Sequence, residues 1–196
     1  QYTQLIARRV RELNVYCEIH PFNKVPPITA DIKGVILSGS PCSVRDEDSP
    51  RVDLSLFGSL PILGICYGAQ LLAHQGGGSV QASGHREYGR AHMTSVKESP
   101  LLNGLSATGQ VWMSHGDRAE RLPEGFETIA SSKSCDHAAI MNEARRIWAV
   151  QFHPEVTHTQ HGAEMLAQFL DLCGFRRDWS MGLFVDEAVA AIRAQV

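Results

Sequence analysis

The hydrophobic and polar positions along the chain form helical stripes and short apolar runs that alternate with one another. Leu5, Ile6, Val10 and Leu13 recur at helical spacing, and residues 160–172 predict a later helix. Short apolar runs typical of strands occupy residues 15–19, 35–38, 62–65 and 147–152. This alternation favours a parallel sheet that is covered by helices on both of its faces.

The stretch from residue 79 to residue 141 has a different pattern. Its apolar and polar residues alternate in short runs at residues 92–96, 110–113 and 126–130, which is typical of antiparallel strands. We therefore predict an α/β fold. Its central sheet would be open and mostly parallel, with helices on both faces and a small antiparallel or mixed extension.

One cysteine lies between the apolar run at residues 62–65 and a helix-forming run at residues 69–73. Cys66 has Gly64 and Gly68 two residues away on either side, as in the nucleophile elbow G-x-S-x-G, with sulfur in place of oxygen. Glycine at these positions removes collisions around a strained turn. The N-terminus of the following helix would favour the thiolate form of the cysteine. Taken alone, the motif is equally compatible with a buried structural cysteine.

His153, Pro154 and Glu155 directly follow the apolar run at residues 147–152. A cysteine nucleophile needs a base, and the base needs a partner that fixes its tautomer. Pro154 favours an extended chain, in which residues two apart point to the same side, so we expect the Glu155 carboxylate to reach the His153 imidazole. In isolation the segment is better interpreted as a solvated surface turn. Its combination with the elbow favours a site at the carboxyl ends of the strands.

A third segment of small residues, 38–41, ends the apolar run at residues 35–38. Acyl transfer requires N–H donors directed at the oxyanion of the tetrahedral intermediate. One donor would be the backbone N–H of Tyr67, the residue after the nucleophile. Gly39 and Ser40 would supply the other, unless this segment is only an ordinary loop before the acidic turn that follows it.

Together these segments resemble the class I (triad) glutamine amidotransferase domain, in which an SGGP loop, a GICYGxQ elbow and an FHPE segment occur in this order. Here they read SGSP at residues 38–41, GICYGAQ at residues 64–70 and FHPE at residues 152–155. The resemblance implies a flavodoxin-like α/β fold and a catalytic triad of Cys66 as nucleophile, His153 as general base and acid, and Glu155 as its orienting partner.

The resemblance also implies an oxyanion hole and a glutamine-binding set. The oxyanion hole would be formed by Gly39, Ser40 and Tyr67. The glutamine-binding set would be formed by Gln70, Ser114, His115, Gly116 and Asp117. The chain departs from the family pattern at Ser40, where the family has a glycine, and a positive φ there would strain a serine.

Three further segments, residues 87–91, 111–117 and 155–159, are similar to the glutaminase domain of the GMP synthetase group. This similarity implies glutamine as substrate, a glutaminase domain at residues 1–175 that lacks its first strand, and a helix or linker at residues 176–196. That helix would lead to an ATP-pyrophosphatase synthetase domain, which uses ATP and Mg²⁺ to convert XMP to GMP in a homodimeric cytoplasmic enzyme. The glutaminase domain itself would need no cofactor.

Other members of the fold stay open as alternatives. The same triad occurs in amidotransferases of the CTP, anthranilate and carbamoyl-phosphate type, and a γ-glutamyl hydrolase would also use Cys66 and His153. The segment from Trp112 to Asp117 favours the GMP synthetase group over these enzymes.

The composition of the chain argues against several classes of binding partner. The chain has 196 residues, 43% hydrophobic and 20% charged, with a formal net charge of −3, which argues against a nucleic-acid surface built on bulk charge. No apolar run approaches the length of a membrane span. Five widely spaced cysteines without a C-x-x-C pair fit a reducing compartment. His153, His158 and His161 lie close in sequence, but no cysteine or carboxylate pattern completes a zinc site, so we predict no metal.

Overall fold

A computed structural model of the chain describes residues 2–95, 97–182, 189 and 193. Its helices are α1 (Tyr2–Glu12), α2 (Tyr67–Gln75) and α3 (Gly162–Leu172), with short 3₁₀ helices η1 (Leu54–Phe57) and η2 (Pro100–Leu102). Its strands are β1 (Val35–Leu37), β2 (Ile62–Ile65), β3 (Ser79–Ser95), β4 (Thr108–Arg121), β5 (Glu127–Ser132), β6 (Ala139–Asn142) and β7 (Ile147–Val150). Of the helix or linker predicted at residues 176–196, only residues 176–182, Val189 and Arg193 are among the described residues.

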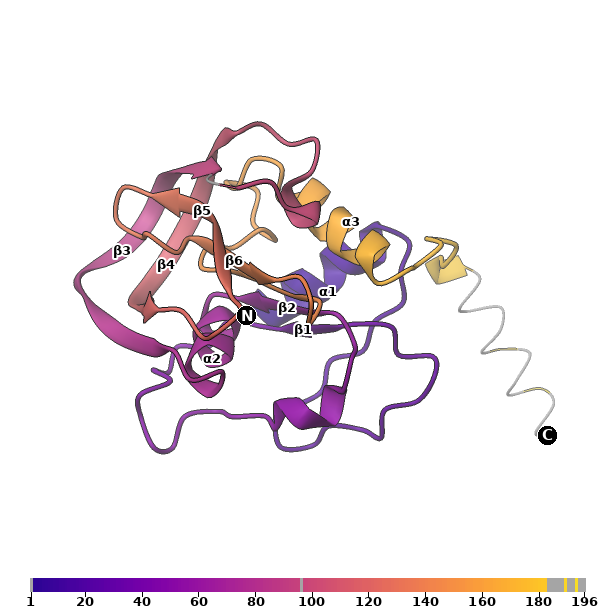
Figure 1. Ribbon diagram of the computed structural model, residues 1–196. Helices are drawn as coiled ribbons and strands as arrows, with labels where there is room; N and C mark the ends of the chain where they lie inside the picture. Colours follow the sequence, from indigo (N-terminus) through magenta and orange to yellow (C-terminus); the bar gives the residue numbers. More distant parts are fainter. Residues whose placement is uncertain (1, 96, 183–188, 190–192, 194–196) are drawn as a thin grey trace.

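The seven strands form one mixed sheet in the order β1-β2-β7-β6-β5-β3-β4 (Figure 1). The predicted α/β class is confirmed. Two of the six strand pairings are parallel, β1 with β2 and β2 with β7, and the other four are antiparallel. The antiparallel part is therefore larger than the small extension that the sequence predicted, because β3 and β4 run for 17 and 14 residues, well beyond their apolar positions.

Helices cover both faces of the parallel strands, as predicted. Figure 1 shows α1 and α3 together on one side and α2 on the other. Leu63 of β2 and Trp148 of β7 pack in one hydrophobic cluster with residues of α1 and α3, whereas Ile62 and Ala149 pack in a second cluster with α2. All four residues of β2 and of β7 are buried, which explains why their sequences are continuous apolar runs.

The prediction of a strand at residues 15–19 is wrong. This segment is irregular, and Tyr16, Glu18 and Ile19 are exposed. Its polar groups bond to α1 in place of a neighbouring strand: the Arg11 guanidinium donates to the carbonyl oxygen of Cys17 at 2.8 Å. Asn14, at φ 62°, has already ended α1 with a sharp change of direction. Apolar character alone did not make a strand here, because a strand also needs a partner for its backbone hydrogen bonds.

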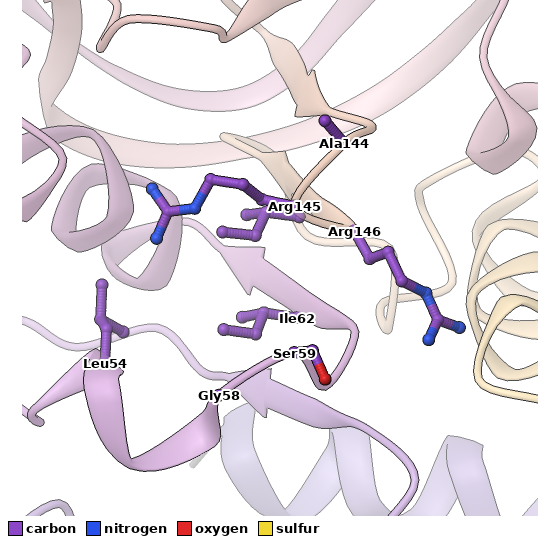
Figure 2. A pocket seen from close by; sticks show the side chains of 8 residues that line it. Leu54, Gly58, Ser59, Ile62, Ala144, Arg145 and Arg146 are labelled. Carbon is purple, nitrogen blue, oxygen red and sulfur yellow. The ribbon is translucent and has the colours of Figure 1, made fainter.

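A cavity of about 270 Å³ opens at the amino ends of β2 and β7, lined in part by Leu54, Ile62 and Ile147. Figure 2 shows the side chains of Arg145 and Arg146 beside it, pointing in different directions. The Arg146 guanidinium donates to the last carbonyl oxygen of α3 at 2.6 Å. The cavity therefore lies at the opposite end of β2 and β7 from Cys66 and His153. Among the described residues, no helix combines the length and apolar character that crossing a bilayer requires.

The turn from β2 into α2 depends on two glycines that allow three backbone segments to approach one another. A Cβ atom on Gly68 would collide with the carbonyl oxygen of Leu37, at the end of β1. A Cβ atom on Gly64 would lie 2.8 Å from the carbonyl oxygen of Gly68. The glycines predicted to flank the elbow are thus required by contacts with backbone atoms, which cannot move aside as a flexible side chain can.

We expect Gly68→Ala to destabilise the fold by about 1–3 kcal/mol or more, because the added methyl group forces β1 and α2 apart. Gly109→Ala is the matched control, since a Cβ there would lie 3.6 Å from the Gln160 side chain, an ordinary contact. Its effect should stay within about 0.5 kcal/mol. Urea denaturation measures both free energies of unfolding, and equal losses in the two variants would contradict the interpretation.

Candidate active site

Cys66 occupies the turn between β2 and α2 in a backbone conformation that non-glycine residues rarely adopt. Its φ is 54° and its ψ is −106°, and strain of this kind is typical of a functional position. The Cys66 N–H donates to the carbonyl oxygen of Val150 at 2.8 Å, and the Cys66 carbonyl accepts from the N–H of Gln70 at 3.1 Å. The residue is 5% exposed. The first-turn N–H groups of α2 therefore begin beside the sulfur, where they favour a negative charge.

His153 is fixed from two sides. Its backbone N–H donates to the carbonyl oxygen of Trp112 in β4 at 3.0 Å. Its own carbonyl accepts from the Thr159 hydroxyl at 2.6 Å, and the same hydroxyl oxygen accepts from the Trp112 N–H at 3.0 Å. This triangle attaches the loop after β7 to the long strand β4, so the imidazole has little freedom to move.

Glu155 contacts the ring of His153, as the sequence predicted. Its Oε1 lies 2.7 Å from His153 Nδ1, and the glutamate is fully buried. The chain, however, turns at Pro154 and Glu155 and does not stay extended. Arg9 of α1 stabilises this turn, because its Nε donates to the Glu155 carbonyl oxygen at 3.0 Å. The contact between Glu155 and His153 thus arises from a turn that α1 stabilises. It does not arise from an extended chain in which residues two apart point to the same side.

The buried pair favours a charged imidazole. Burial lowers the pKa of His153, but hydrogen bonds to Cys66 and Glu155 and their negative charges outweigh it and raise the pKa to about 9. Within the described part of the chain, the second carboxylate oxygen of Glu155 has no hydrogen-bond partner. A buried carboxylate with a single partner depends on a positive charge at that partner. At neutral pH the His153 imidazole is therefore protonated opposite the Glu155 carboxylate.

The segment predicted to form the oxyanion hole reaches the same place. A Cβ on Gly39 would lie 3.3 Å from His153 Cε1 and 3.7 Å from Cys66 Cβ, so the loop after β1 passes beside both residues. Tyr67 is the first residue of α2, and its buried side chain donates a hydrogen bond to the Pro50 carbonyl oxygen at 2.5 Å. Ser40 is not among the described residues with a positive φ. The strain that a serine would suffer there does not arise.

Residues predicted to bind glutamine line β4 and α2, and several already have partners within the protein. The thiol of Cys66 donates to the carbonyl oxygen of Ser114 at 3.5 Å. Gln70 is buried, and its Nε2 donates to the carbonyl oxygen of Asp117 at 2.7 Å. The Asp117 carboxylate pairs with Arg45 at 3.1 Å and accepts from Ser43.

His115 is also buried. Its side chain is 1% exposed, with Nε2 lying 3.2 Å from Glu87 Oε2 and Nδ1 lying 3.0 Å from the Asp117 carbonyl oxygen. Burial lowers the pKa of His115, although Glu87 opposes this effect. Gly116 is half-buried between His115 and Asp117 in β4.

Besides Arg9, sequence reasoning missed three residues that contact the candidate triad. Gln151 is 3% exposed, and its Nε2 lies 3.8 Å from the Cys66 sulfur. The ring centroids of Tyr2 and His153 are 4.6 Å apart. Thr159 anchors His153 as described above. Of these, Gln151 carried a usable signal, because it is a polar residue at the end of a buried apolar run. Tyr2 and Thr159 reach the site only through the tertiary fold.

Comparison with known proteins identifies the family of the chain. The family profile described as "Glutamine amidotransferase class-I" matches residues 1–173. The chain belongs to this family. It is 52% identical to the GMP synthase [glutamine-hydrolyzing] of Cytophaga hutchinsonii and 53% identical to that of Bacteroides fragilis, in each case over the whole of this chain and 39% of the relative. The chain thus spans about two fifths of the length of these curated relatives.

Solved structures are also similar to this chain in their fold. A Thermoplasma acidophilum protein assigned to GMP synthase has a TM-score of 0.76 to this chain at 33% identity, covering 89% of each chain. A glutamine amidotransferase from Thermotoga maritima aligns with a TM-score of 0.59 at 20% identity, which supports the fold alone.

The stability of this amidotransferase chain should depend on pH through His153. An unfolded histidine has a pKa near 6.5, and the folded value is about 9. The stabilisation is therefore fully present below about pH 6.5 and is lost as the pH rises through about 9. The difference in unfolding free energy between wild type and Glu155→Gln should be largest near pH 6.5 and shrink by pH 9.5. Glu143→Gln, at an exposed turn, should show no such trend.

Proposed function

We propose that the chain hydrolyses the side-chain amide of glutamine through a glutamyl thioester on Cys66. The observation that supports this most is that buried His153 contacts the Glu155 carboxylate at 2.7 Å and that Cys66 and Glu155 together raise its pKa, while the sulfur lies at the N-terminus of α2. This arrangement supplies a nucleophile, its proton donor and acceptor, and an orienting carboxylate. Membership of the amidotransferase family supports glutamine as the source of the amide.

In the first step, the Cys66 thiolate attacks the carboxamide carbon and a C–S bond forms. The N–H groups of Tyr67 and of the loop at Gly39 and Ser40 stabilise the oxyanion of the tetrahedral intermediate. The His153 imidazolium then gives its proton to the departing nitrogen, and the C–N bond breaks to release ammonia. His153 is left neutral, opposite a glutamyl thioester.

In the second step, neutral His153 takes a proton from a water molecule, whose oxygen attacks the thioester carbon. The second tetrahedral intermediate collapses with cleavage of the C–S bond, releasing glutamate and the thiolate. The imidazolium forms again beside Glu155, so the starting charge state is restored. Gln70 and the segment from Ser114 to Asp117 form the wall against which we place the bound glutamine.

We further propose that the ammonia serves GMP synthesis. The identity of 52–53% with GMP synthases over the whole chain favours this group over amidotransferases of the CTP, anthranilate or carbamoyl-phosphate type and over a γ-glutamyl hydrolase. A synthetase domain in the same full-length protein would use ATP and Mg²⁺ to aminate XMP, with residues 176–196 leading toward it from the glutaminase domain at residues 1–175. The full enzyme would be a cytoplasmic homodimer, and five free cysteines fit such a reducing compartment.

Labelling with the glutamine analogue 6-diazo-5-oxo-norleucine tests the nucleophile and the substrate together. We expect a single adduct on Cys66 by peptide mapping, suppressed by excess glutamine and absent in Cys66→Ala. Glutamine hydrolysis should fall to background in the same variant. Exposed Cys42 provides the internal control. An adduct on Cys42 with Cys66 unmodified would refute the assignment of the nucleophile.

The two partners of the nucleophile should differ in their importance. His153→Ala should slow glutamine-dependent turnover more than Glu155→Ala, because loss of the base costs more than loss of the group that orients it. In a full-length enzyme that contains the synthetase domain, both variants and Cys66→Ala should still form GMP from supplied ammonia. Equal or reversed losses would mean that the roles are wrong, and failure with ammonia would point to damaged folding or domain coupling.

A further inference from the structure

Two buried glutamines connect β4 to the nucleophile. Gln70 of α2 and Gln151, which follows β7, are 4% and 3% exposed. Gln70 Nε2 donates to the Asp117 carbonyl oxygen at 2.7 Å and to Gln151 Oε1 at 3.3 Å, and Gln151 Nε2 lies 3.8 Å from the Cys66 sulfur. The backbone N–H of Gln151 is held by the Ala138 carbonyl oxygen at 2.8 Å. The polar path from β4 to the sulfur is therefore continuous.

The chemistry of this path fixes the direction of every hydrogen bond in it. A backbone carbonyl can only accept, so the group of Gln70 that faces Asp117 must be its NH₂ group. That group has a second hydrogen, which it donates to Gln151, so the oxygen of the Gln151 amide must face Gln70. The NH₂ group of Gln151 is thereby left facing the sulfur of Cys66. A carbonyl of β4 thus determines which end of a distant amide meets the nucleophile.

The sulfur has a different partner in each protonation state. As a thiol it donates to the Ser114 carbonyl oxygen at 3.5 Å, and a thiolate cannot make that bond. As a thiolate it becomes a charged acceptor, and a hydrogen bond to a charged group is stronger than one to a neutral group. A donor fixed on the sulfur therefore offsets the interaction with Ser114 and favours the reactive form.

We propose that Gln151 is a further catalytic residue, which donates an amide N–H to the Cys66 thiolate, and that Gln70 is the positioning residue that orients it. The inference rests on the proposed function for its place in glutamine hydrolysis. It assigns Gln70 a task that differs from the contact with bound glutamine predicted from the sequence. The charged side chains nearby are His153 with Glu155 after β7 and Asp117 with Arg45 beside β4, and all four stay unchanged in the variants below.

The test is the pH dependence of Cys66 alkylation by iodoacetamide, which requires no glutamine. In Gln151→Met, which keeps the size of the side chain but removes the donor, the midpoint of the rate profile should rise by about one pH unit. Alkylation below the midpoint should then slow about tenfold, because one unit is a tenfold change in thiolate fraction. Gln151→Glu, which places oxygen against the sulfur, should shift the midpoint further in the same direction.

Further variants separate orientation from packing. Gln70→Met should give a smaller shift in the same direction, and the double variant with Gln151→Met should shift no further than Gln151→Met alone, since Gln70 acts through Gln151. Gln168→Met, which removes an amide that donates to the Asn103 carbonyl oxygen at 3.0 Å, should leave the profile unchanged. Protection of buried Cys135 and Cys173 reports folding in every variant.

A wild-type profile in folded Gln151→Met would overturn the inference. If that variant loses protection of Cys135 and Cys173, the isosteric Gln151→Glu decides in its place, and an unshifted midpoint there has the same meaning. Failure of the proposed function gives a different result. In that case glutamine would not suppress labelling of wild-type Cys66 by its analogue, while the midpoint shifts in the Gln151 variants would persist.

Discussion

The close approach of β1 to the first turn of α2 is the constraint on which the rest of the site depends. Gly68 touches the end of β1 so closely that any side chain there would strike the Leu37 carbonyl. That contact brings the loop at Gly39 beside Cys66 and His153. It also holds Cys66 at a φ of 54°, with its sulfur near the free N–H groups of the helix. The close approach at Gly68 thus helps to bring together Cys66, the N-terminus of α2 and the candidate oxyanion loop.

The antiparallel half of the sheet has a direct part in the site. β4 supplies carbonyl oxygens to three of its groups: Trp112 to the backbone of His153, Ser114 to the thiol, and Asp117 to the side chain of Gln70. Carbonyls on a long paired strand are rigid, because the ladder of β3 and β4 holds them in register. The large antiparallel region therefore provides rigid hydrogen-bond acceptors, which position residues that follow the parallel strands.

Much of this arrangement was accessible from the sequence, for identifiable reasons. The elbow glycines, the buried strands β2 and β7 and the pairing of His153 with Glu155 leave local patterns, because each depends on residues within a few positions of one another. The segment at residues 15–19 misled the interpretation, since only Val15 and Cys17 pack in the cluster that includes α1, and the segment pairs with no strand in the described part of the chain. Arg9, Tyr2 and Thr159 could not be predicted, because tertiary packing alone brings them to His153 and Glu155.

Burial explains why the site contains so many polar partners. His153 is 2% exposed and Glu155 is fully buried, so neither can exchange a lost contact for water, and each charge must be matched within the protein. In the proposed mechanism, the His153 imidazolium would balance the Glu155 carboxylate on one side and a Cys66 thiolate on the other. Because His153 would lose its positive charge on protonating the leaving group in that mechanism, the thiolate would also need a hydrogen-bond donor that is neutral. The Gln151 amide that we propose as this donor would meet that requirement, since it can stabilise the sulfur without competing for the proton.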